Sequence, residues 1–472
     1  MPVMDTLIKG ATVVLPHGPA RVGVGIADGV IVEICDEKWL PDAKTIIDGA
    51  GKVLAPGFVD SHVHIRGDHP EREDFASGSA AAAMGGVTTI LEMPVVVPPV
   101  VRGELLEQRA REAETQSIVD FGLYGGAGED NLDEIGGLAE AGAVAFKTFL
   151  HPAPAGREEE FRGLTVSNNA ALFSVFGRVS KTGLIAAVHA EDYELLESAE
   201  FAPGTVLSGL ASYEKLRPSI VEVSAAARAL FFARRTGARL MLCHVSAPET
   251  VDMALQARYA GQEVLIETCP QYVLFSSERI DSLGPFGKVK PPIRDEATRN
   301  RLHSYMVEGR FDFIGSDHAP FTSAEKERYG NNLDAAPSGL PGIELTLSLL
   351  LNEVSRKYMD ICSAVKLFSE NAAKAFRLYP RKGCIAPGAD ADLVLIDLSR
   401  QQHISRDALT TRSRHSGLIY EGLVLTGMPV LTMVRGSIVM RDGVVVGEPG
   451  IGRFVRPVLG ARDRPDTEKI TG

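Results

Sequence analysis

Several features that mark large classes of protein are missing from this sequence. Lysine and arginine total 49 against 61 aspartate and glutamate, a formal net charge of −12. The chain therefore lacks the basic excess that nucleic acids and anionic membranes attract. No run approaches the ~18 apolar residues of a membrane span, and the first residues lack the basic and apolar segments of a secretory signal. We expect neither a nucleic-acid partner nor a membrane partner.

Cysteine is scarce, and its spacing does not indicate a metal site. The residues are odd in number and form no CxxC pair, which argues against a disulfide framework or a thiolate zinc site and favours a reducing, cytoplasmic location. They are Cys35, Cys243, Cys269, Cys362 and Cys384. Nucleotide-binding signatures are also missing, since no GxGxxG follows an early strand and no GxxxxGK[ST] occurs. What remains is a large acidic protein of a class rich in enzymes.

Two β-rich ends enclose a different middle. Short apolar runs separated by Gly and Asp turns fill residues 1–54, and the same texture returns over residues 383–454. This pattern predicts one small β domain built from both termini. Residues 455–472 are rich in Arg, Pro and Asp, which predicts a tail or an oligomerisation arm.

The middle, residues 55–382, alternates short apolar runs with helical stretches such as Glu104–Thr115 and Ser219–Thr236. Eight such runs with helices between them predict an α/β fold, a (β/α)8 barrel, rather than an open doubly wound sheet. The runs are 58–59, 87–91, 119–123, 143–150, 184–188, 240–243, 264–266 and 311–314.

Residues that can bind a metal ion stand where five of these runs end. His62 and His64 are two residues apart, so in a strand both side chains point to one face. The other four residues are Lys147, His189, His244 and Asp317. Because the carboxyl ends of barrel strands meet at one mouth, we expect all six side chains to lie together.

Each of these residues also has a simpler interpretation when taken alone. The His pair fits a solvent-facing strand end, a single strand-end His fits a hydrogen-bonded structural role, and Asp317 fits a helix N-cap. Lys147 is harder to explain, because a lysine in a buried strand is desolvated unless it is paired or modified. The occurrence of all of them at strand ends, in order along the barrel, favours a metal site.

Four imidazoles and one carboxylate suit zinc or a similar divalent ion better than calcium or magnesium. A neutral Lys147 amine can add carbon dioxide and become an anionic carbamate, whose two oxygens can bridge two ions about 3.5–4 Å apart. A bridging hydroxide would then be the nucleophile, and Asp317 would move its proton to the leaving nitrogen. This arrangement predicts amide or ester hydrolysis without a covalent intermediate.

At these residues the chain resembles the amidohydrolase superfamily, and within it the cyclic amidohydrolases. The motifs that carry the resemblance are Pro56–His64, Gly85–Thr89, Phe146-Lys147, Cys243–Ser246, Lys290–Arg294, Gly315–Pro320 and Gly383–Asp392. The resemblance implies that His62, His64, carboxylated Lys147 and Asp317 hold one metal ion, and that Lys147, His189 and His244 hold the other. It also implies a composite β-sandwich and a homo-oligomer, a tetramer or a dimer.

The choice of subfamily depends on a few positions at the barrel mouth. Dihydroorotases resemble the chain at Arg66, which would pair with a substrate carboxylate, but two further carboxylate contacts of that subfamily are replaced by Val95 and Phe321. Hydantoinases resemble residues 337–342, with Ser338 in place of their usual Asn, but the chain has Pro152 where they carry a tyrosine. Allantoinases lack this tyrosine too and resemble Glu267–Tyr272.

An allantoinase-like hydrolase of a cyclic amide or ureide is therefore the leading hypothesis. A hydantoinase or dihydropyrimidinase and a dihydroorotase are the alternatives. A non-catalytic scaffold is a remote alternative, because none of the six metal-ligand positions is replaced. Arg66, Lys290, Ser338 and Gly339 are the predicted substrate contacts. Simpler interpretations remain open for two of them, a loop salt bridge for Arg66 and a surface lysine for Lys290.

Four further residues near the predicted site receive other interpretations. His69 and His151 lie on loops after strands and could touch the substrate, but they fit solvent-exposed loop histidines better. His318 follows Asp317 and is expected to orient it rather than to bind the metal. Cys243, beside His244, fits a buried small apolar residue.

Overall fold

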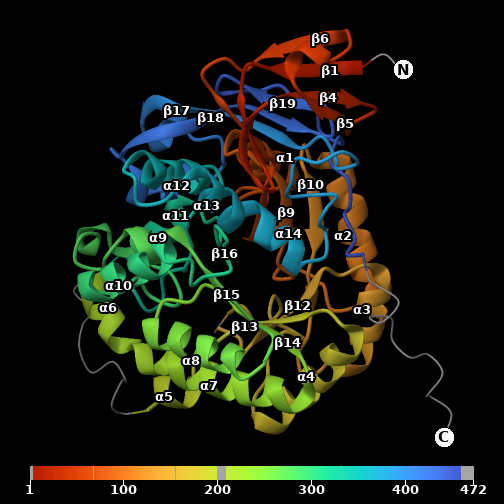
Figure 1. Cartoon of the computed structure of the whole chain (residues 1–472). Coiled ribbons are helices and arrows are strands. Elements are labelled where there is room, and N and C mark those ends of the chain that lie inside the picture. The colour runs from red at the N-terminus through yellow and green to blue at the C-terminus, as the bar shows by residue number, and fades with distance from the viewer. Residues whose placement is uncertain (1–3, 67, 155, 199–208, 331, 459–472) are drawn as a thin grey trace, which may run out of the picture.

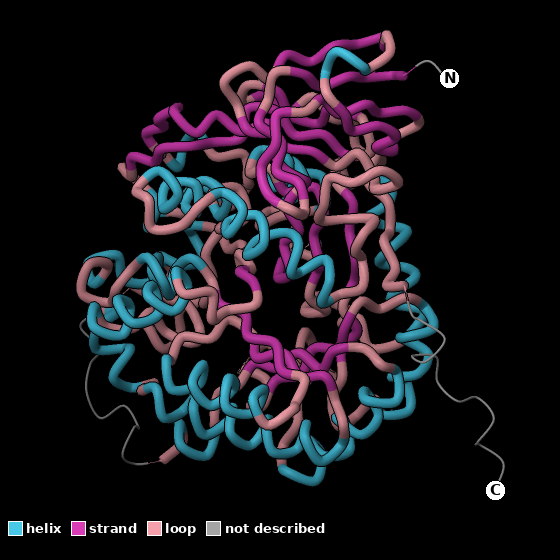
Figure 2. The backbone as a smooth tube through the Cα atoms, viewed as in Figure 1, coloured by secondary structure: helices cyan, strands magenta, loops and turns pink. Residues whose placement is uncertain are grey.

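The computed structural model describes residues 4–66, 68–154, 156–198, 209–330 and 332–458. Its middle part consists of parallel strands alternating with helices, and β-rich segments from both ends of the chain pack beside it (Figures 1 and 2). No helix among the described residues is long and apolar enough to cross a membrane.

The parallel strands form two arcs in consecutive order, β8-β9-β10 and β11 to β16. They are β8 (Phe58–Val63), β9 (Val87–Glu92), β10 (Asp120–Leu123), β11 (Gly125–Gly126), β12 (Ala145–Phe149), β13 (Ile185–His189), β14 (Arg239–Leu242), β15 (Val264–Thr268) and β16 (Phe313–Ile314). Tyr124 is the only residue between β10 and β11. The His64 N–H, just after β8, donates to the carbonyl of His318, just after β16 (2.8 Å), and this bond joins the two ends of the strand series. Each of the eight predicted apolar runs overlaps one of these strands.

Helices surround these strands (Figure 2). They are α1 (Phe75–Met84), α2 (Gly103–Gln116), α3 (Ile135–Ala141), α4 (Asn169–Thr182), α5 (Tyr193–Leu196), α6 (Leu210–Leu216), α7 (Ser219–Thr236), α8 (Pro248–Tyr259), α9 (Pro270–Leu274), α10 (Glu296–Val307), α11 (Ser323–Glu327), α12 (Thr346–Ser355), α13 (Ile361–Val365) and α14 (Asn371–Ala375). Gly183 and Gly237 end α4 and α7 with φ of +69° and +71°, a conformation that glycine adopts without strain. Each glycine turns the chain directly into the next strand.

The barrel strands have two apolar faces, as expected when helices cover the outside and side chains fill the inside. Ala145, Ala187 and Met241 belong to one buried cluster inside the barrel. Phe146, Val188 and Leu242 belong to the larger cluster beneath the helices. Since side chains alternate along a strand, the residues two positions after Ala145 and Ala187 share the inner face. Those residues are Lys147 and His189.

Two further sheets contain both ends of the chain, and they lie together at one end of the molecule (Figure 1). One has the order β5-β4-β1-β6 and the other β20-β19-β18-β17-β7-β2-β3, so strands from both termini are hydrogen-bonded within one sheet. The strands are β1 (Met4–Lys9), β2 (Thr12–Leu15), β3 (Gly18–Arg21), β4 (Gly23–Ala27), β5 (Val30–Cys35), β6 (Ala43–Asp48), β7 (Val53–Pro56), β17 (Leu393–His403), β18 (Val424–Val434), β19 (Ser437–Arg441) and β20 (Val444–Val445). The division of the chain at residues 54, 382 and 454 stays a prediction.

The start of the predicted tail packs on the barrel. Val455 is buried, its N–H donates to the Phe121 carbonyl (2.8 Å), and the Phe454 and Phe121 rings stack. The rest of the tail, residues 459–472, lies outside the described residues.

A buried ionic cluster joins the β-rich end to the barrel. The Lys382 ammonium contacts the carboxylates of Asp120 (2.5 Å), Asp392 (2.6 Å) and Asp390 (2.8 Å). Arg435 also pairs with Asp120. The three aspartates lie close enough to hold a metal ion, but the lysine already satisfies them, so this cluster is structural.

Candidate metal centre and substrate cavity

The six predicted metal ligands come from five barrel strands and converge at one mouth. His62 lies in β8, Lys147 in β12 and His189 at the end of β13. His64, His244 and Asp317 lie just after β8, β14 and β16. All of them line one cavity of about 820 Å³. The structure therefore brings together every residue that the strand-end pattern selected.

The ligands fall into two neighbouring groups. Asp317 Oδ1 lies 3.4 Å from His62 Nε2 and 3.5 Å from His64 Nε2, and these three residues form a cluster whose donor atoms could hold one ion. His189 Nδ1 lies 3.0 Å from His244 Nε2. The His62 and His244 ring centroids are 5.4 Å apart, so the two groups adjoin.

Several donor atoms in this cluster are buried without a protein partner. Lys147 is 1% exposed, yet its Nζ has no hydrogen bond with any residue that the structure describes, and the same is true of His64 Nδ1 and His244 Nδ1. A buried polar atom without a partner costs free energy of about 1–3 kcal/mol. The group thus fits a bound ligand better than a closed protein core, and its imidazole and carboxylate donors fit a borderline divalent ion.

Burial keeps three of these imidazoles, those of His64, His189 and His244, neutral. Desolvation lowers the pKa of His64 to about 3, and it also lowers the pKa of His189 and His244. Burial pushes the pKa of Asp317 upward, but the nearby His62 and His64 outweigh it and hold that pKa below its usual value. Neutral rings and an ionised carboxylate are the states that bind a metal ion.

The backbone is strained at two of the six positions. His244 and Asp317 have φ of +39° and +46°, in the left-handed region that residues with a Cβ rarely adopt. Such conformations persist where the surrounding structure holds them and cluster at functional sites. Here they turn both side chains from the strand ends toward the cavity.

Two carboxylates that the sequence interpretation did not select support these histidines. Glu267, at the end of β15, accepts from Ser61 Oγ (2.6 Å) and from the His244 N–H (3.2 Å), and lies 2.8 Å from His62 Nδ1. Glu191 lies 2.8 Å from His189 Nε2 and pairs with Arg217. Both fix the orientation of a predicted ligand ring. Glu267 follows the run 264–266, so the strand-end rule that selected the ligands would also have selected it.

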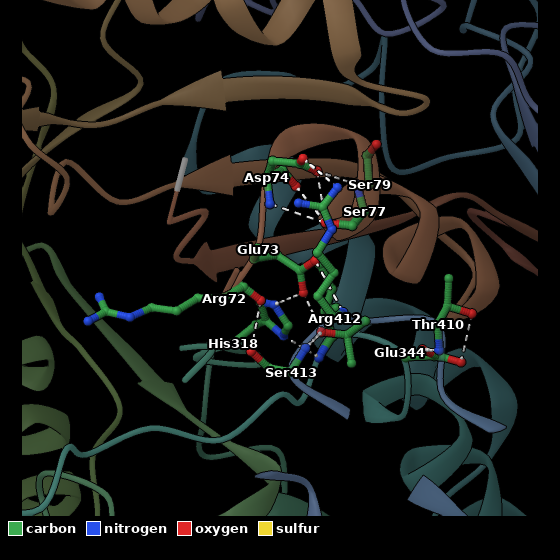
Figure 3. A network of polar contacts seen from close by, with 12 residues as sticks. Arg72, Glu73, Asp74, Ser77, Ser79, His318, Glu344, Thr410, Arg412 and Ser413 are labelled. Carbon is green, nitrogen blue, oxygen red and sulfur yellow. Dashed lines mark hydrogen bonds and ion pairs between the residues drawn. The ribbon is translucent and has the colours of Figure 1, made fainter. Parts of the chain in front are cut away.

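His318 contacts a different set of residues from the expected one. Its Nε2 lies 3.5 Å from Glu73, and its backbone oxygen accepts from His64 N–H. Figure 3 shows this imidazole beside Glu73 and the segment that contains Arg412 and Ser413. Thr411 also donates to Glu73, and Ser413 Oγ donates to the Arg72 carbonyl (2.8 Å). No contact between the His318 imidazole and the Asp317 side chain occurs among the residues described, so an orienting role through that contact is not supported.

The four predicted substrate contacts all line the cavity, but their surroundings differ. Arg66 is buried and donates to Glu160 (3.0 Å) and to the Val95 carbonyl (3.2 Å), which is the loop salt bridge of the simpler interpretation. Lys290 is partly buried and faces the cavity, so it is not a surface lysine. At Gly339 a Cβ would lie 2.4 Å from the Ala319 carbonyl, which explains the glycine.

The two loop histidines differ in position. His69 is partly exposed beside Glu71 and is not part of the cavity lining. His151 lines the cavity, with its ring centroid 4.8 Å from that of His189 and its Nδ1 2.6 Å from the Pro152 carbonyl. This is the alternative in which His151 can touch the substrate, and the sequence could not decide it because the position depends on the path of a long loop. Cys243 is buried, as expected.

The sequence model of the amidohydrolase family matches residues 53–439. The chain belongs to the amidohydrolase family. It is 34% identical to an L-hydantoinase of Paenarthrobacter aurescens over 96% of this chain and 98% of that one. It is 35% identical to an allantoinase of Deinococcus radiodurans over 96% and 99% of the two chains.

Solved structures of this family superpose closely on the chain. An L-hydantoinase (dihydropyrimidinase) from Arthrobacter aurescens matches with a TM-score of 0.91 and 33% identity, over 96% of this chain and 100% of that one. A dihydropyrimidinase from Brevibacillus agri matches with a TM-score of 0.87 and 28% identity, over 97% and 100%. These similarities confirm the predicted fold class, an amidohydrolase barrel with a β-rich domain.

Proposed function

We propose that this amidohydrolase opens the ring of a cyclic ureide by hydrolysis of a C–N bond, with an allantoin-like or hydantoin-like substrate. Allantoin is itself a substituted hydantoin, so both relatives with high identity point to the same five-membered ring. The observation that carries the proposal is the convergence of His62, His64, Lys147, His189, His244 and Asp317 on one cavity.

The residues fit two divalent ions, with zinc as the ion that the imidazole and carboxylate donors favour. His62, His64 and Asp317 would hold one ion, and His189 and His244 the other. Lys147, carboxylated on Nζ, would contribute to both. The Nζ of Lys147, at 1% exposure and without a hydrogen bond to any described residue, supports this modification. When bound, the two ions supply an activated water and polarise the carbonyl of the scissile amide.

Asp317 is proposed to move the proton. Its pKa lies below the usual value, so the carboxylate is ionised and can accept a proton from the attacking water. It can then deliver that proton to the nitrogen that leaves as the ring opens. Ser338 and Gly339 are proposed to position the ring, because they lie on the cavity wall in the segment that follows Asp317.

A dihydroorotase activity receives less support. Arg66, the residue that would bind the carboxylate of dihydroorotate, is already paired with Glu160, which it shares with Arg157. The two other positions are Val95 and Phe321, and neither side chain can pair with an anion. A homo-oligomer and a cytoplasmic location stay predictions.

The test is a panel assay on the metal-loaded protein with allantoin, hydantoin, dihydrouracil, dihydroorotate and simple cyclic imides. Among these rings we expect the highest kcat/KM for allantoin or hydantoin. Hydrolysis of dihydroorotate alone would contradict the proposal, and so would the absence of turnover with every ring after zinc, manganese or cobalt loading.

A further inference from the structure

Besides Lys147, four basic side chains line the cavity, and three of them are paired with carboxylates. Apart from Lys147, the lysines and arginines of the lining are Arg66, Arg157, Arg217 and Lys290. Arg66 and Arg157 both pair with Glu160. Arg217 pairs with Glu191, with two contacts of 3.0 Å. Lys290 has no hydrogen bond or ion pair with any residue that the structure describes.

The backbone around Lys290 is fixed even though its ammonium is unpaired. The Pro291 carbonyl accepts from Tyr272 Oη (2.9 Å), and the Lys288 carbonyl accepts from the Gly339 N–H (3.0 Å). Lys288 itself donates to the carbonyls of Asp334 (2.8 Å) and Ala336 (2.6 Å). The two neighbouring lysines therefore have different roles. Lys288 holds the segment that contains Ser338 and Gly339 through hydrogen bonds, and Lys290 lines the cavity.

The charges around Lys290 do not replace a direct partner. Burial lowers the pKa of Lys290, as do the neighbouring Arg217 and Arg157, whereas Glu191 and Asp334 raise it, and the net result is a pKa of about 8. The side chain is therefore mostly an ammonium at pH 7. Glu191 is already shared between His189 and Arg217. A partly desolvated ammonium without a counter-ion is costly, and an anionic ligand offsets that cost.

We propose that Lys290 binds a carboxylate on the substituent of the substrate, so that the preferred substrates are hydantoins, five-membered cyclic ureides, with an acidic side chain. The inference rests on the proposed ring-opening function and adds a substrate class to it. It also assigns the carboxylate to the wall formed by residues 288–291, not to Arg66, whose guanidinium already has an ion pair with Glu160.

The test compares two ligands of nearly equal size, hydantoin-5-acetate and hydantoin-5-acetamide. Dissociation constants are measured by calorimetry on the metal-loaded full chain, and kcat/KM is measured in parallel. The variants are Lys290→Met and Lys290→Arg, with Lys181→Met as the control, since Lys181 is exposed in the last turn of α4. Lys290→Met leaves no described partner unpaired, so the variant is expected to fold.

The bound metal ions also attract a carboxylate in every variant. The deciding quantity is therefore the affinity for hydantoin-5-acetate divided by the affinity for hydantoin-5-acetamide, compared between variants. We expect Lys290→Met to reduce this ratio by about 10- to 100-fold, the size of a hydrogen bond to a charged group. Lys290→Arg should retain most of the ratio, and Lys181→Met all of it. An unchanged ratio in Lys290→Met would overturn the inference, and so would an equal loss of affinity for both ligands.

The two parts of the proposal fail in different ways. Hydrolysis of both ligands without dependence on Lys290 would contradict the carboxylate site and leave the ring-opening function intact. A Lys290-dependent affinity ratio without hydrolysis of either ligand would contradict the function and leave the carboxylate site intact. Binding of neither ligand would contradict both.

Discussion

Glu267 offers the sharpest test of how the candidate metal centre is held. This carboxylate is fully buried and accepts hydrogen bonds from Ser61 and the His244 N–H, and it lies 2.8 Å from His62 Nδ1. Glu267→Ala would leave three buried donors without an acceptor. Each would lower the free energy of unfolding by about 1–3 kcal/mol, or roughly 3–9 kcal/mol together. That loss approaches the whole stability of a typical protein, about 5–15 kcal/mol, so the alanine variant is uninformative.

Glu267→Gln preserves the shape and removes the charge. The glutamine oxygen can still accept from His62 and His244, and the Ser61 hydroxyl can turn to accept from the amide. Each bond then changes from charge-assisted to neutral, and the metal-free protein should lose about 1–2 kcal/mol of stability. Because the carboxylate makes the His62 ring a stronger ligand, metal affinity should fall by about 10- to 100-fold.

Metal affinity is measured by competition with a chromophoric chelator, and stability by urea unfolding of the metal-free protein. Glu92→Gln is the matched control, since Glu92 is equally buried and pairs with Arg109 (3.1 Å) outside the cavity lining. The control should lose stability and keep its metal affinity. Unchanged metal affinity in Glu267→Gln, or an equal loss in Glu92→Gln, would refute the reasoning.

Three further predictions concern other parts of the molecule. Lys147→Ala should lower kcat by about 1,000-fold or more, because several kcal/mol of metal-dependent stabilisation of the transition state are lost. Acetate or propionate should restore part of the activity. Near-normal turnover without such rescue would contradict the carbamate. Chelation should abolish turnover and lower Tm, and zinc should restore both; full activity in metal-free protein would contradict the metal centre. Lys382→Met should lower the free energy of unfolding, measured with urea, by about 3–5 kcal/mol, because it leaves the buried carboxylates of Asp120 and Asp392 without their cation. The kcat/KM of the folded protein should change less than about twofold. An unaltered unfolding midpoint would show that Arg435 is enough to neutralise the cluster.

Hydrophobic periodicity predicted the elements that position the site. The stretch Ser219–Thr236 was expected to be a helix and forms α7 with those bounds, and Glu104–Thr115 lies within α2. Long amphipathic helices and buried strands are encoded locally, so a pattern of apolar residues is enough to find them. The segments 151–165 and 320–340 have no such period, and their paths could not be derived.

The sequence by itself determined the barrel strands and the identity of the candidate metal ligands. Both depend on local rules, since alternation along a strand selects one face and the ends of parallel strands meet at one mouth. Only the tertiary structure decided which charges neutralise each other. Glu267 reaches His62 across 205 positions and Glu160 reaches Arg66 across 94, and no local pattern encodes such a contact. These pairings leave the Lys290 ammonium without a described partner and thereby make it the candidate for binding an anionic substrate.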